Sequence, residues 1–375
     1  MENVERPGSL WRVDRFCAIL CITYTDGGIK VKAARLYGPG DLRIDELGVP
    51  EPGPGQVLLQ VLTVGVCGSG VHYFLDGGIG DDRVKEPFVI GHEFSARVAA
   101  LGDGVGGPTV GTRVAVEPAI SCGECEFCLA GHPNICKNIL FCSTPPTPGA
   151  LQEYIVHPAE LCFPIPDAIS DAQGALLEPL GIALHAVSLA KLHPGDVVAI
   201  LGCGPIGLLT LQVARICGAR AAYVTDVVPE RLAMAEKLGA TAVFKADEGD
   251  PVAWVKAQTG GRGVDVAFEA AWADETVAQA AEMARNGGKL IMVGIPREDV
   301  AIFPAHAVRR KGLTIKYVRR MKHTYPRAIP MVRDGLIDLE SLITHRFPLE
   351  KAAEAYNLVA SYGDGVIKVV IEVGT

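Results

Sequence analysis

The pattern of hydrophobic and polar positions changes character twice along the chain. Between residue 31 and about residue 180, short apolar runs alternate with turns rich in glycine and proline. This alternation is typical of short strands joined by loops. The runs cover residues 32–37, 42–46, 56–64, 95–100, 113–116 and 152–156. The first part of the chain is therefore predicted to be rich in β-strand.

From about residue 181 the pattern alternates between buried strands and amphipathic helices. Strands are predicted at residues 196–201, 221–225, 264–268 and 289–293, and helices at residues 205–217, 229–238 and 274–284. Alternating strands and helices favour a parallel sheet covered on both faces. Residues 313–375 are expected to return to the β-rich part. The predicted fold class is α/β plus β.

Composition excludes several classes of protein. Of the 375 residues 49% are hydrophobic, which is too many for a disordered chain. The net charge of −8 and the 6% of aromatic residues argue against a nucleic-acid binder, and no apolar run is long enough to cross a membrane. Residues 1–30 read as an N-terminal extension. Its apolar stretch at residues 16–24 lacks a following cleavage site, so a cytoplasmic protein is expected.

A glycine-rich turn follows the predicted strand at residues 196–201 and opens a predicted helix. The motif consists of Gly202, Cys203, Gly204, Pro205, Ile206 and Gly207. In this context the glycines permit a tight turn, close approach of a pyrophosphate and close helix packing. Asp226 ends the next strand, where a carboxylate accepts hydrogen bonds from ribose and repels a 2′-phosphate. NAD is therefore favoured over NADP, with Arg231 expected to flank the adenosine. The alternative is an ordinary glycine-rich turn followed by a solvated aspartate.

A second motif is a cluster of cysteines. Four of the 11 cysteines are Cys122, Cys125, Cys128 and Cys136. Four thiolates at this spacing suit tetrahedral zinc, and a closed set of four leaves no open position for chemistry. A structural zinc site is predicted. The alternatives are four incidental thiols or reversible disulfides.

A third set of metal-ligating residues is dispersed along the chain. Cys67, His92 and Glu178 would together form a mixed catalytic zinc site with one open position. Their spacing alone does not establish such a site, because a single histidine or buried cysteine is more often part of a core.

The order of these motifs identifies a family resemblance. The motifs are Cys67-Gly68-Ser69, Gly91-His92-Glu93, the four cysteines, Glu178-Pro179-Leu180 and the glycine turn. In this order they resemble the zinc-containing medium-chain dehydrogenases, and most closely the polyol dehydrogenases of the sorbitol and xylitol type. The resemblance implies a GroES-like catalytic domain at residues 31–180, an inserted Rossmann domain at residues 181–312, and a return to the catalytic domain at residues 313–375. It also implies a homo-oligomer, with a tetramer favoured over a dimer.

The resemblance also assigns roles to individual residues. Cys67, His92 and Glu93 match the ligands of the catalytic zinc, and Glu178 matches a position that reaches the metal directly or through water. Ser69 and His72 match the proton relay. The substrate pocket corresponds to Tyr73, Ile79, Phe141, Thr144 and Arg320, and a cofactor-contacting strand end corresponds to Val293, Gly294 and Ile295.

Two departures from the family pattern stand out. Gly70 occupies a position at which the family usually has an aspartate that supports a zinc-ligating histidine. Arg319 and Met321 flank Arg320, where sorbitol-type enzymes tend to have aromatic residues. The first departure weakens the expected support of the metal site, and the second leaves the length and stereochemistry of the substrate open.

The function implied by the resemblance is oxidation of a secondary hydroxyl of a polyol to a ketone, with NAD as hydride acceptor and zinc as Lewis acid. A dehydrogenase of a simple secondary alcohol, a diol or threonine is the alternative within the same class. An alternative of another class is a non-catalytic zinc- and nucleotide-binding protein. A small-molecule substrate is expected, with no nucleic-acid or membrane partner.

Overall fold

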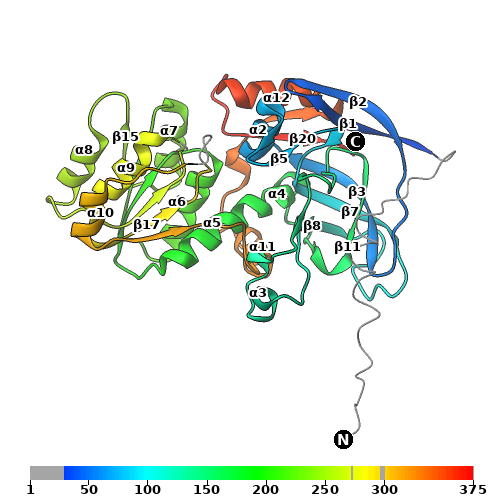
Figure 1. Ribbon diagram of the computed structural model, residues 1–375, viewed down its shortest axis with the longest axis horizontal. Helices are drawn as coiled ribbons and strands as arrows, with labels where there is room; N and C mark the ends of the chain where they lie inside the picture. The colour runs from blue at the N-terminus through cyan, green and yellow to red at the C-terminus, as the bar shows by residue number, and fades with distance from the viewer. Residues whose placement is uncertain (1–28, 272, 296–299, 375) are drawn as a thin grey trace, which may run out of the picture.

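The computed structural model describes residues 29–271, 273–295 and 300–374. The predicted N-terminal extension, residues 1–30, lies outside these ranges except for its last two residues. Within the described ranges, no helix is both long and apolar enough to span a lipid bilayer. The chain forms a β-rich part and a part built on a parallel sheet, which lie side by side (Figure 1).

The β-rich part is organised around a seven-stranded sheet with strand order β12-β8-β7-β3-β20-β19, in which β11 also pairs with β3. Its neighbouring strands are antiparallel except for β19 and β20. The strands of this sheet are β3 (Gln56–Gly65), β7 (Glu93–Leu101), β8 (Arg113–Val116), β11 (Tyr154–Pro158), β12 (Cys162–Pro164), β19 (Ile343–Pro348) and β20 (Lys368–Glu372). Because β3 is central, nearly all of its residues are buried.

Further strands and, within the described ranges, four α-helices complete the β-rich part. The strands are β1 (Lys30–Gly38), β2 (Asp41–Gly48), β4 (Gly78–Ile79), β5 (Asp82–Arg83), β6 (Phe88–Val89), β9 (Ala119–Ile120) and β10 (Leu140–Phe141). The helices are α2 (Gly68–Asp76), α3 (Glu126–Leu129), α4 (Asp171–Ala175) and α12 (Ala352–Ser361). Helix α12 packs against α2, so the C-terminal region covers the first helix of the described residues.

The second part holds a six-stranded, fully parallel sheet with strand order β15-β14-β13-β16-β17-β18. Its strands are β13 (Val197–Leu201), β14 (Ala221–Asp226), β15 (Ala242–Lys245), β16 (Val264–Glu269), β17 (Ala284–Met292) and β18 (Thr314–Tyr317). The order reverses between β13 and β16. In open α/β sheets, ligands bind beyond the carboxyl ends of the strands at such a point.

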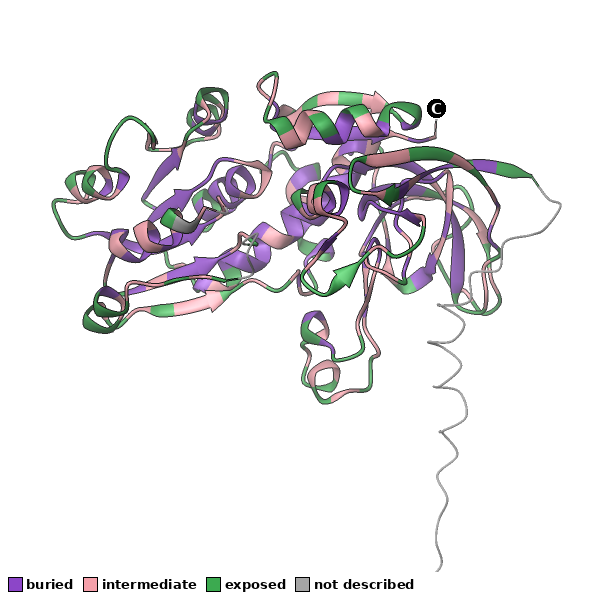
Figure 2. Ribbon diagram, turned by 45° about the horizontal axis from the view of Figure 1, so that its top comes forward, coloured by how far each residue is buried: buried purple, intermediate pink, exposed green. Residues whose placement is uncertain are grey.

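Helices cover this sheet and connect it to the β-rich part. They are α5 (Leu177–Ala190), α6 (Pro205–Ile216), α7 (Pro229–Lys237), α8 (Pro251–Gln258), α9 (Asp274–Met283), α10 (Ala305–Lys311) and α11 (Tyr325–Arg333). Most residues of α5 are buried, as Figure 2 shows by its colour, because a helix that is apolar on all sides packs on all sides. It contacts α6 and α11 and lies between the two parts.

The predicted fold class, a β-rich part plus a parallel α/β part, is confirmed. The strand at 113–116 and the helix starting at Pro205 are found where they were predicted. The strand expected at residues 152–156 begins two residues later as β11, and the one expected at 289–293 begins earlier, in β17. The boundary drawn after residue 312 is wrong for β18, which pairs with β17 in the parallel sheet. As an edge strand, β18 has no fully buried residue and lacks the apolar pattern of its neighbours.

Candidate active site

The glycine turn between β13 and α6 lies at the point where the strand order reverses. Gly202 has a φ of 96°, and a Cβ added there would come within 2.8 Å of the backbone of Ala270 and Ala271. A Cβ on Gly207 would lie 1.8 Å from the carbonyl oxygen of Gly202. For a Cβ on Gly204, by contrast, the nearest atom would be Nη1 of Arg231, 3.9 Å away. The turn is therefore closed around Gly202 and Gly207 and open at Gly204, where a pyrophosphate needs room.

Asp226 and Arg231 flank this turn. The Asp226 carboxylate accepts hydrogen bonds from the backbone N–H of Cys203 at 2.5 Å and of Val228 at 2.9 Å. These bonds fix the carboxylate at the end of β14, beside the turn. Arg231 is buried and donates through Nε and Nη2 to the carbonyl oxygen of Val366, at 3.2 and 3.1 Å. Most of the Arg231 guanidinium is thus committed to the C-terminal region of the chain.

The strand end expected to contact the cofactor follows β17. The N–H groups of Val293 and Gly294 both donate to the carbonyl oxygen of Glu269, at 2.8 and 3.0 Å. Glu269 ends β16, so this segment lies at the carboxyl edge of the parallel sheet. Ile295 is exposed there, and the residues from 296 to 299 lie outside the described ranges.

Cys67, His92 and Glu93 converge although they come from separate loops and strands. One ligand atom from each lies within 4.8 Å of the others. Cys67 precedes α2, and Glu93 begins β7, whose partner β3 leads directly toward Cys67. Thiolate, imidazole and carboxylate are the donors of catalytic zinc sites with an open position. The chemistry of the donor set and its spacing therefore fit a zinc ion.

Lys368 is a neighbour of this cluster that the sequence analysis missed. Its ammonium group forms an ion pair with Glu93, and both side chains are only 2% exposed. The same ammonium group donates to the carbonyl oxygen of Val66 at 2.8 Å. The signal in the sequence is a lone lysine inside the apolar stretch 366–371, because a buried lysine requires a charged partner.

Burial sets the protonation of the cluster in the absence of an ion. It raises the pKa of Cys67 to about 11, together with the charge of Glu93, and it lowers the pKa of His92. Burial also raises the pKa of Glu178, with a smaller contribution from Glu93. A bound cation favours the ionised thiol and carboxyl groups, so metal binding would release protons. Glu178 is buried at the start of α5, close enough for its charge to act on His92, but it does not belong to the group of three that meets the 4.8 Å criterion.

The two residues expected to relay a proton both lie on the first turns of α2. The Ser69 hydroxyl donates to the Sγ atom of Cys67 at 3.3 Å. One turn further, Nδ1 of His72 lies 3.3 Å from the Asp76 carboxylate. Ser69 is therefore in direct contact with a ligand residue, and His72 is oriented by a carboxylate that the sequence analysis did not single out.

Four of the five residues expected to line the substrate pocket are linked by contacts. The Arg320 guanidinium lies over the Phe141 ring at 4.1 Å, and the Phe141 ring lies 5.0 Å from the His92 ring. The hydroxyl of Tyr73 shares a hydrogen bond with Thr144. Ile79, in β4, packs against the core of the β-rich part.

Arg320 combines several unusual features. Its φ is 54°, a conformation that residues with a side chain rarely adopt, and its Nη1 atom is buried without a hydrogen-bond partner among the described residues. Burial lowers its pKa to about 10, and the charge of Arg319 acts in the same direction. A buried donor of this kind, beside the metal-ligating cluster, is available to a substrate oxygen.

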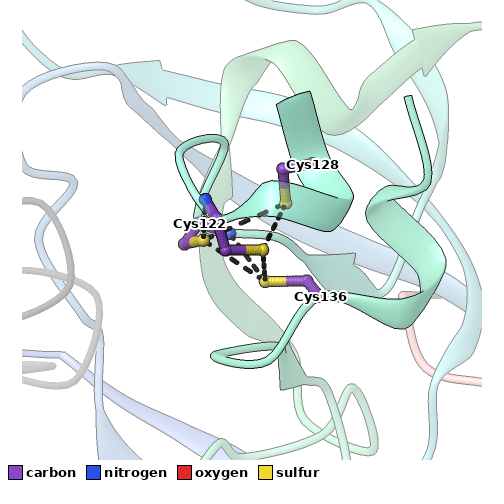
Figure 3. Close-up of side chains that lie close together, drawn as sticks. Cys122, Cys128 and Cys136 are labelled. Carbon is purple, nitrogen blue, oxygen red and sulfur yellow. Dashed lines mark hydrogen bonds between the residues drawn. The ribbon is translucent and has the colours of Figure 1, made fainter. Parts of the chain in front are cut away.

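The four cysteines form a second cluster on the loop around α3 (Figure 3). Their sulfur atoms are separated by 3.4 Å (Cys122 to Cys136), 3.5 Å (Cys125 to Cys128), 3.9 Å (Cys125 to Cys136) and 3.9 Å (Cys122 to Cys128). Tetrahedral zinc with Zn–S bonds of about 2.3 Å requires sulfur atoms about 3.8 Å apart. These distances are too long for disulfides and fit a structural zinc ion.

The cysteine loop also contacts the segment that carries Arg320. The Asn134 side chain donates from Nδ2 to the carbonyl oxygen of Arg319 at 2.9 Å. Met321, the other departure from the family pattern, is buried against Gly181 of α5, where a Cβ would come within 2.4 Å of its sulfur atom. Met321 therefore packs into the helix layer, and the segment is held from both sides.

Comparisons with known proteins agree with this arrangement. A family model described as an alcohol dehydrogenase GroES-like domain matches residues 53–167, and one described as a zinc-binding dehydrogenase matches residues 205–334. The sorbitol dehydrogenase of Bacillus subtilis (strain 168) is 37% identical over 341 residues, which is 91% of this chain and 97% of that protein.

Solved structures show the same architecture. An Escherichia coli oxidoreductase of unknown specificity superposes with a TM-score of 0.88 at 35% identity, covering 92% of this chain and 100% of that one. An Escherichia coli alcohol dehydrogenase solved with NADH has a TM-score of 0.83 at 30% identity, covering 92% of this chain and 100% of that one.

Proposed function

The chain belongs to the zinc-containing medium-chain alcohol dehydrogenase family, among relatives of the sorbitol dehydrogenase type, and from this premise we propose that it oxidises a secondary hydroxyl of a polyol to a ketone with NAD. The observation that carries the proposal is the convergence of Cys67, His92 and Glu93. Their approach would be unnecessary in a protein that only binds a nucleotide.

In this proposal Cys67, His92 and Glu93 hold the catalytic zinc, with Glu178 close by. When bound there, zinc acts as a Lewis acid that lowers the pKa of the substrate hydroxyl. The Lys368 ammonium group compensates part of the negative charge of the ligands. His92 and Glu93 are buried, so charge developing on a substrate oxygen there would be felt more strongly than in water.

Proton removal is assigned to the start of α2. Ser69 lies against Cys67, so its hydroxyl is placed to accept the substrate proton and pass it on. His72, oriented by Asp76, is the next acceptor toward solvent. A hydroxyl followed by an imidazole is an ordinary route for a proton at neutral pH.

Polar groups of the pocket recognise the hydroxyl groups that flank the reacting carbon. Arg320 has a buried nitrogen with no hydrogen-bond partner in the described part of the chain, and Glu178 and the Tyr73–Thr144 pair add further partners. Buried polar groups penalise a substrate that leaves them unpaired. The pocket therefore favours a polyol over a simple alcohol.

The end of the sheet beyond β13 and β16 would hold the cofactor. The open backbone at Gly204 and the N-terminus of α6 would bind its pyrophosphate. Asp226 takes the ribose hydroxyls, and its charge disfavours a 2′-phosphate. Arg231 donates to Val366 through Nε and Nη2, whereas its Nη1 atom is the one nearest Gly204; the expected preference for NAD therefore rests on the Asp226 carboxylate. We assign the enzyme to the cytoplasm and to a homotetramer on the same family premise.

A substrate panel tests the proposal. NADH formation is followed by absorbance with sorbitol, xylitol, 2,3-butanediol, 2-propanol and threonine, each with NAD and with NADP. We expect kcat/KM to be at least tenfold higher for a polyol than for 2-propanol, with NAD preferred. Turnover that is greatest with 2-propanol or threonine contradicts the assignment to polyols, and absence of turnover with every compound contradicts an enzyme.

A further inference from the structure

Gly70 faces the ring of Tyr356. Gly70 lies on the first turn of α2, three residues after Cys67, and is buried. A Cβ at this position would lie 3.0 Å from the Tyr356 hydroxyl oxygen and 3.2 Å from its Cε1 atom. A side chain at residue 70 and the hydroxyl of Tyr356 therefore compete for the same space.

Tyr356 reaches this position from the C-terminal region of the chain. It lies on α12, which packs against α2, and it is 1% exposed. Its ring lies 5.5 Å from that of Phe74 in a tilted arrangement. The ring is thereby fixed on α2 with its polar end directed at the first turn.

The chemical surroundings of the Tyr356 hydroxyl are those of the metal-ligating cluster. Besides burial, the charges that act on it come from Cys67 and Glu93, and together they raise the pKa of the phenol. A buried tyrosine hydroxyl needs a hydrogen-bond partner, and the groups whose charges act on this hydroxyl belong to residues that we expect to ligate the metal.

We propose that Tyr356 is a positioning residue of the catalytic metal site, with its hydroxyl occupying the place that a side chain at residue 70 would otherwise fill. The inference rests on the proposed function, because it presumes a metal at Cys67, His92 and Glu93. The family resemblance places an aspartate at residue 70, so this chain exchanges a carboxylate from α2 for a phenol from α12. The exchange removes one negative charge from the surroundings of the cation while keeping a polar group there.

The exchange also connects the metal site to the end of the chain. Lys368 on β20 already pairs with Glu93, and Tyr356 lies one element earlier, on α12. Residues that orient metal ligands typically change metal affinity 10- to 100-fold when they are removed. The C-terminal region is thus expected to control metal affinity from outside the ligand set.

The first test is Tyr356→Phe, which removes only the hydroxyl. Zinc per chain is measured after dialysis against graded concentrations of a chelator. We expect the affinity for the zinc ion at Cys67, His92 and Glu93, here called the second zinc ion, to fall 10- to 100-fold. The zinc ion bound by the four cysteines should remain. Tyr223→Phe is the matched control, because Tyr223 is also buried but donates to the carbonyl oxygen of Gln258 in the other part of the molecule. An affinity for the second zinc ion within twofold of wild type in Tyr356→Phe overturns the proposal.

The second test reverses the exchange, by placing an aspartate at residue 70 and removing the hydroxyl of Tyr356. Gly70→Asp alone inserts a carboxylate against the phenol, and we expect it to weaken the second zinc site. The double variant Gly70→Asp/Tyr356→Phe removes the nearest clashing atom and supplies a new polar group, so its affinity should recover to within a few-fold of wild type. The absorption bands of bound cobalt(II) report the ligand geometry independently of activity. If the loss of affinity for the second zinc ion in the double variant equals the sum of the losses in the two single variants, expressed as free energies, the proposal is overturned.

The two proposals fail separately. A wild-type protein that binds a second metal ion and oxidises no alcohol contradicts the proposed function and leaves the role of Tyr356 measurable by chelator competition. A wild-type protein that oxidises polyols while Tyr356→Phe keeps its metal affinity contradicts only the inference about Tyr356.

Discussion

Lys368 lies in an otherwise apolar strand because Glu93 compensates its charge. Both side chains are almost fully buried, and breaking such a pair leaves one uncompensated charge in the interior. The pair also directs Glu93 toward Cys67 and His92. At the scale of single residues, the site is thus determined as much by the partners of the ligands as by the ligands themselves.

Glu117 is a half-buried residue whose carboxyl protonation affects stability. Burial raises its pKa from 4.5 to about 8, so the folded state holds a proton that the unfolded state loses above about pH 4.5. The resulting stability is complete below that pH and is lost as the pH rises through about 8. Between pH 5 and pH 8 we expect the free energy of unfolding of wild type to fall by on the order of 4 kcal/mol relative to that of Glu117→Gln. Denaturant unfolding of both proteins across this pH range measures the difference. If the unfolding free energies of the two proteins change with pH in parallel, the carboxyl group of Glu117 is not neutral in the folded state.

Asp226 is expected to determine the choice of cofactor. Asp226→Ala removes the charge that repels a 2′-phosphate, so the ratio of kcat/KM for NADP to that for NAD should rise at least tenfold. Asp226→Asn is the matched control, because it keeps a group that can bond to the N–H of Cys203 and Val228 while losing the charge. If neither variant changes the ratio, the carboxylate does not discriminate between the cofactors.

The loop around α3 shows how an element with little core of its own is held. Its α-helix has four residues, none of them buried, so we expect metal ligation by the four cysteines to take the place of packing. Asn134 then joins this loop to the segment of Arg319 and Arg320. At the scale of elements, the proposed structural metal site would therefore support one wall of the proposed substrate pocket.

Loss of one cysteine should affect stability more than chemistry. We expect Cys125→Ser to bind one zinc ion fewer per chain and to lose about 3 kcal/mol of unfolding free energy, the value for a ligand at a hundredfold excess over its Kd. KM for the polyol should rise severalfold through Arg320. Cys217→Ser is the control, because this exposed cysteine lies outside both clusters. Unchanged zinc content in Cys125→Ser would count against the structural site.

Elements with a clear hydrophobic period could be predicted from the sequence, and those defined by tertiary pairing could not. The helix at Pro205 follows a buried strand and a glycine turn, so local signals suffice. Strand β18 has no buried residue and exists because it pairs with β17. For the site, the ligand residues follow from motifs, and Lys368 has a local signal as a lone lysine in an apolar stretch. The approach of Tyr356 depends on how α12 packs on α2, for which the sequence has no local signal.

One cluster of buried residues extends across the two parts of the molecule, and each part also has a separate core of its own. A single cluster of buried residues includes Ile165 and Ile169 next to α4, Leu180 of α5 and Val198 of the parallel sheet. Arg231 adds a polar connection, from α7 to Val366. A shared core couples the unfolding of the two parts, and it holds the cofactor crevice against the metal-ligating cluster.

This continuity predicts a single cooperative unfolding transition. Leu180 is fully buried in α5, and Leu180→Ala should lower the free energy of unfolding by about 2–5 kcal/mol through the cavity that it leaves. Calorimetry of both proteins, each saturated with zinc, should show one transition that moves to lower temperature. Two separate transitions, of which only one moves, would show that the parts unfold independently.

The central claim is that one metal ion, held by Cys67, His92 and Glu93, is required for polyol oxidation. It is tested most directly by removing all metal from the protein and following sorbitol-dependent NADH formation as zinc is added back. We predict that the first equivalent of zinc per chain restores stability with little activity, and that activity rises with the second equivalent in wild type but not in Cys67→Ala. Full activity in the metal-free protein or in Cys67→Ala would contradict the account.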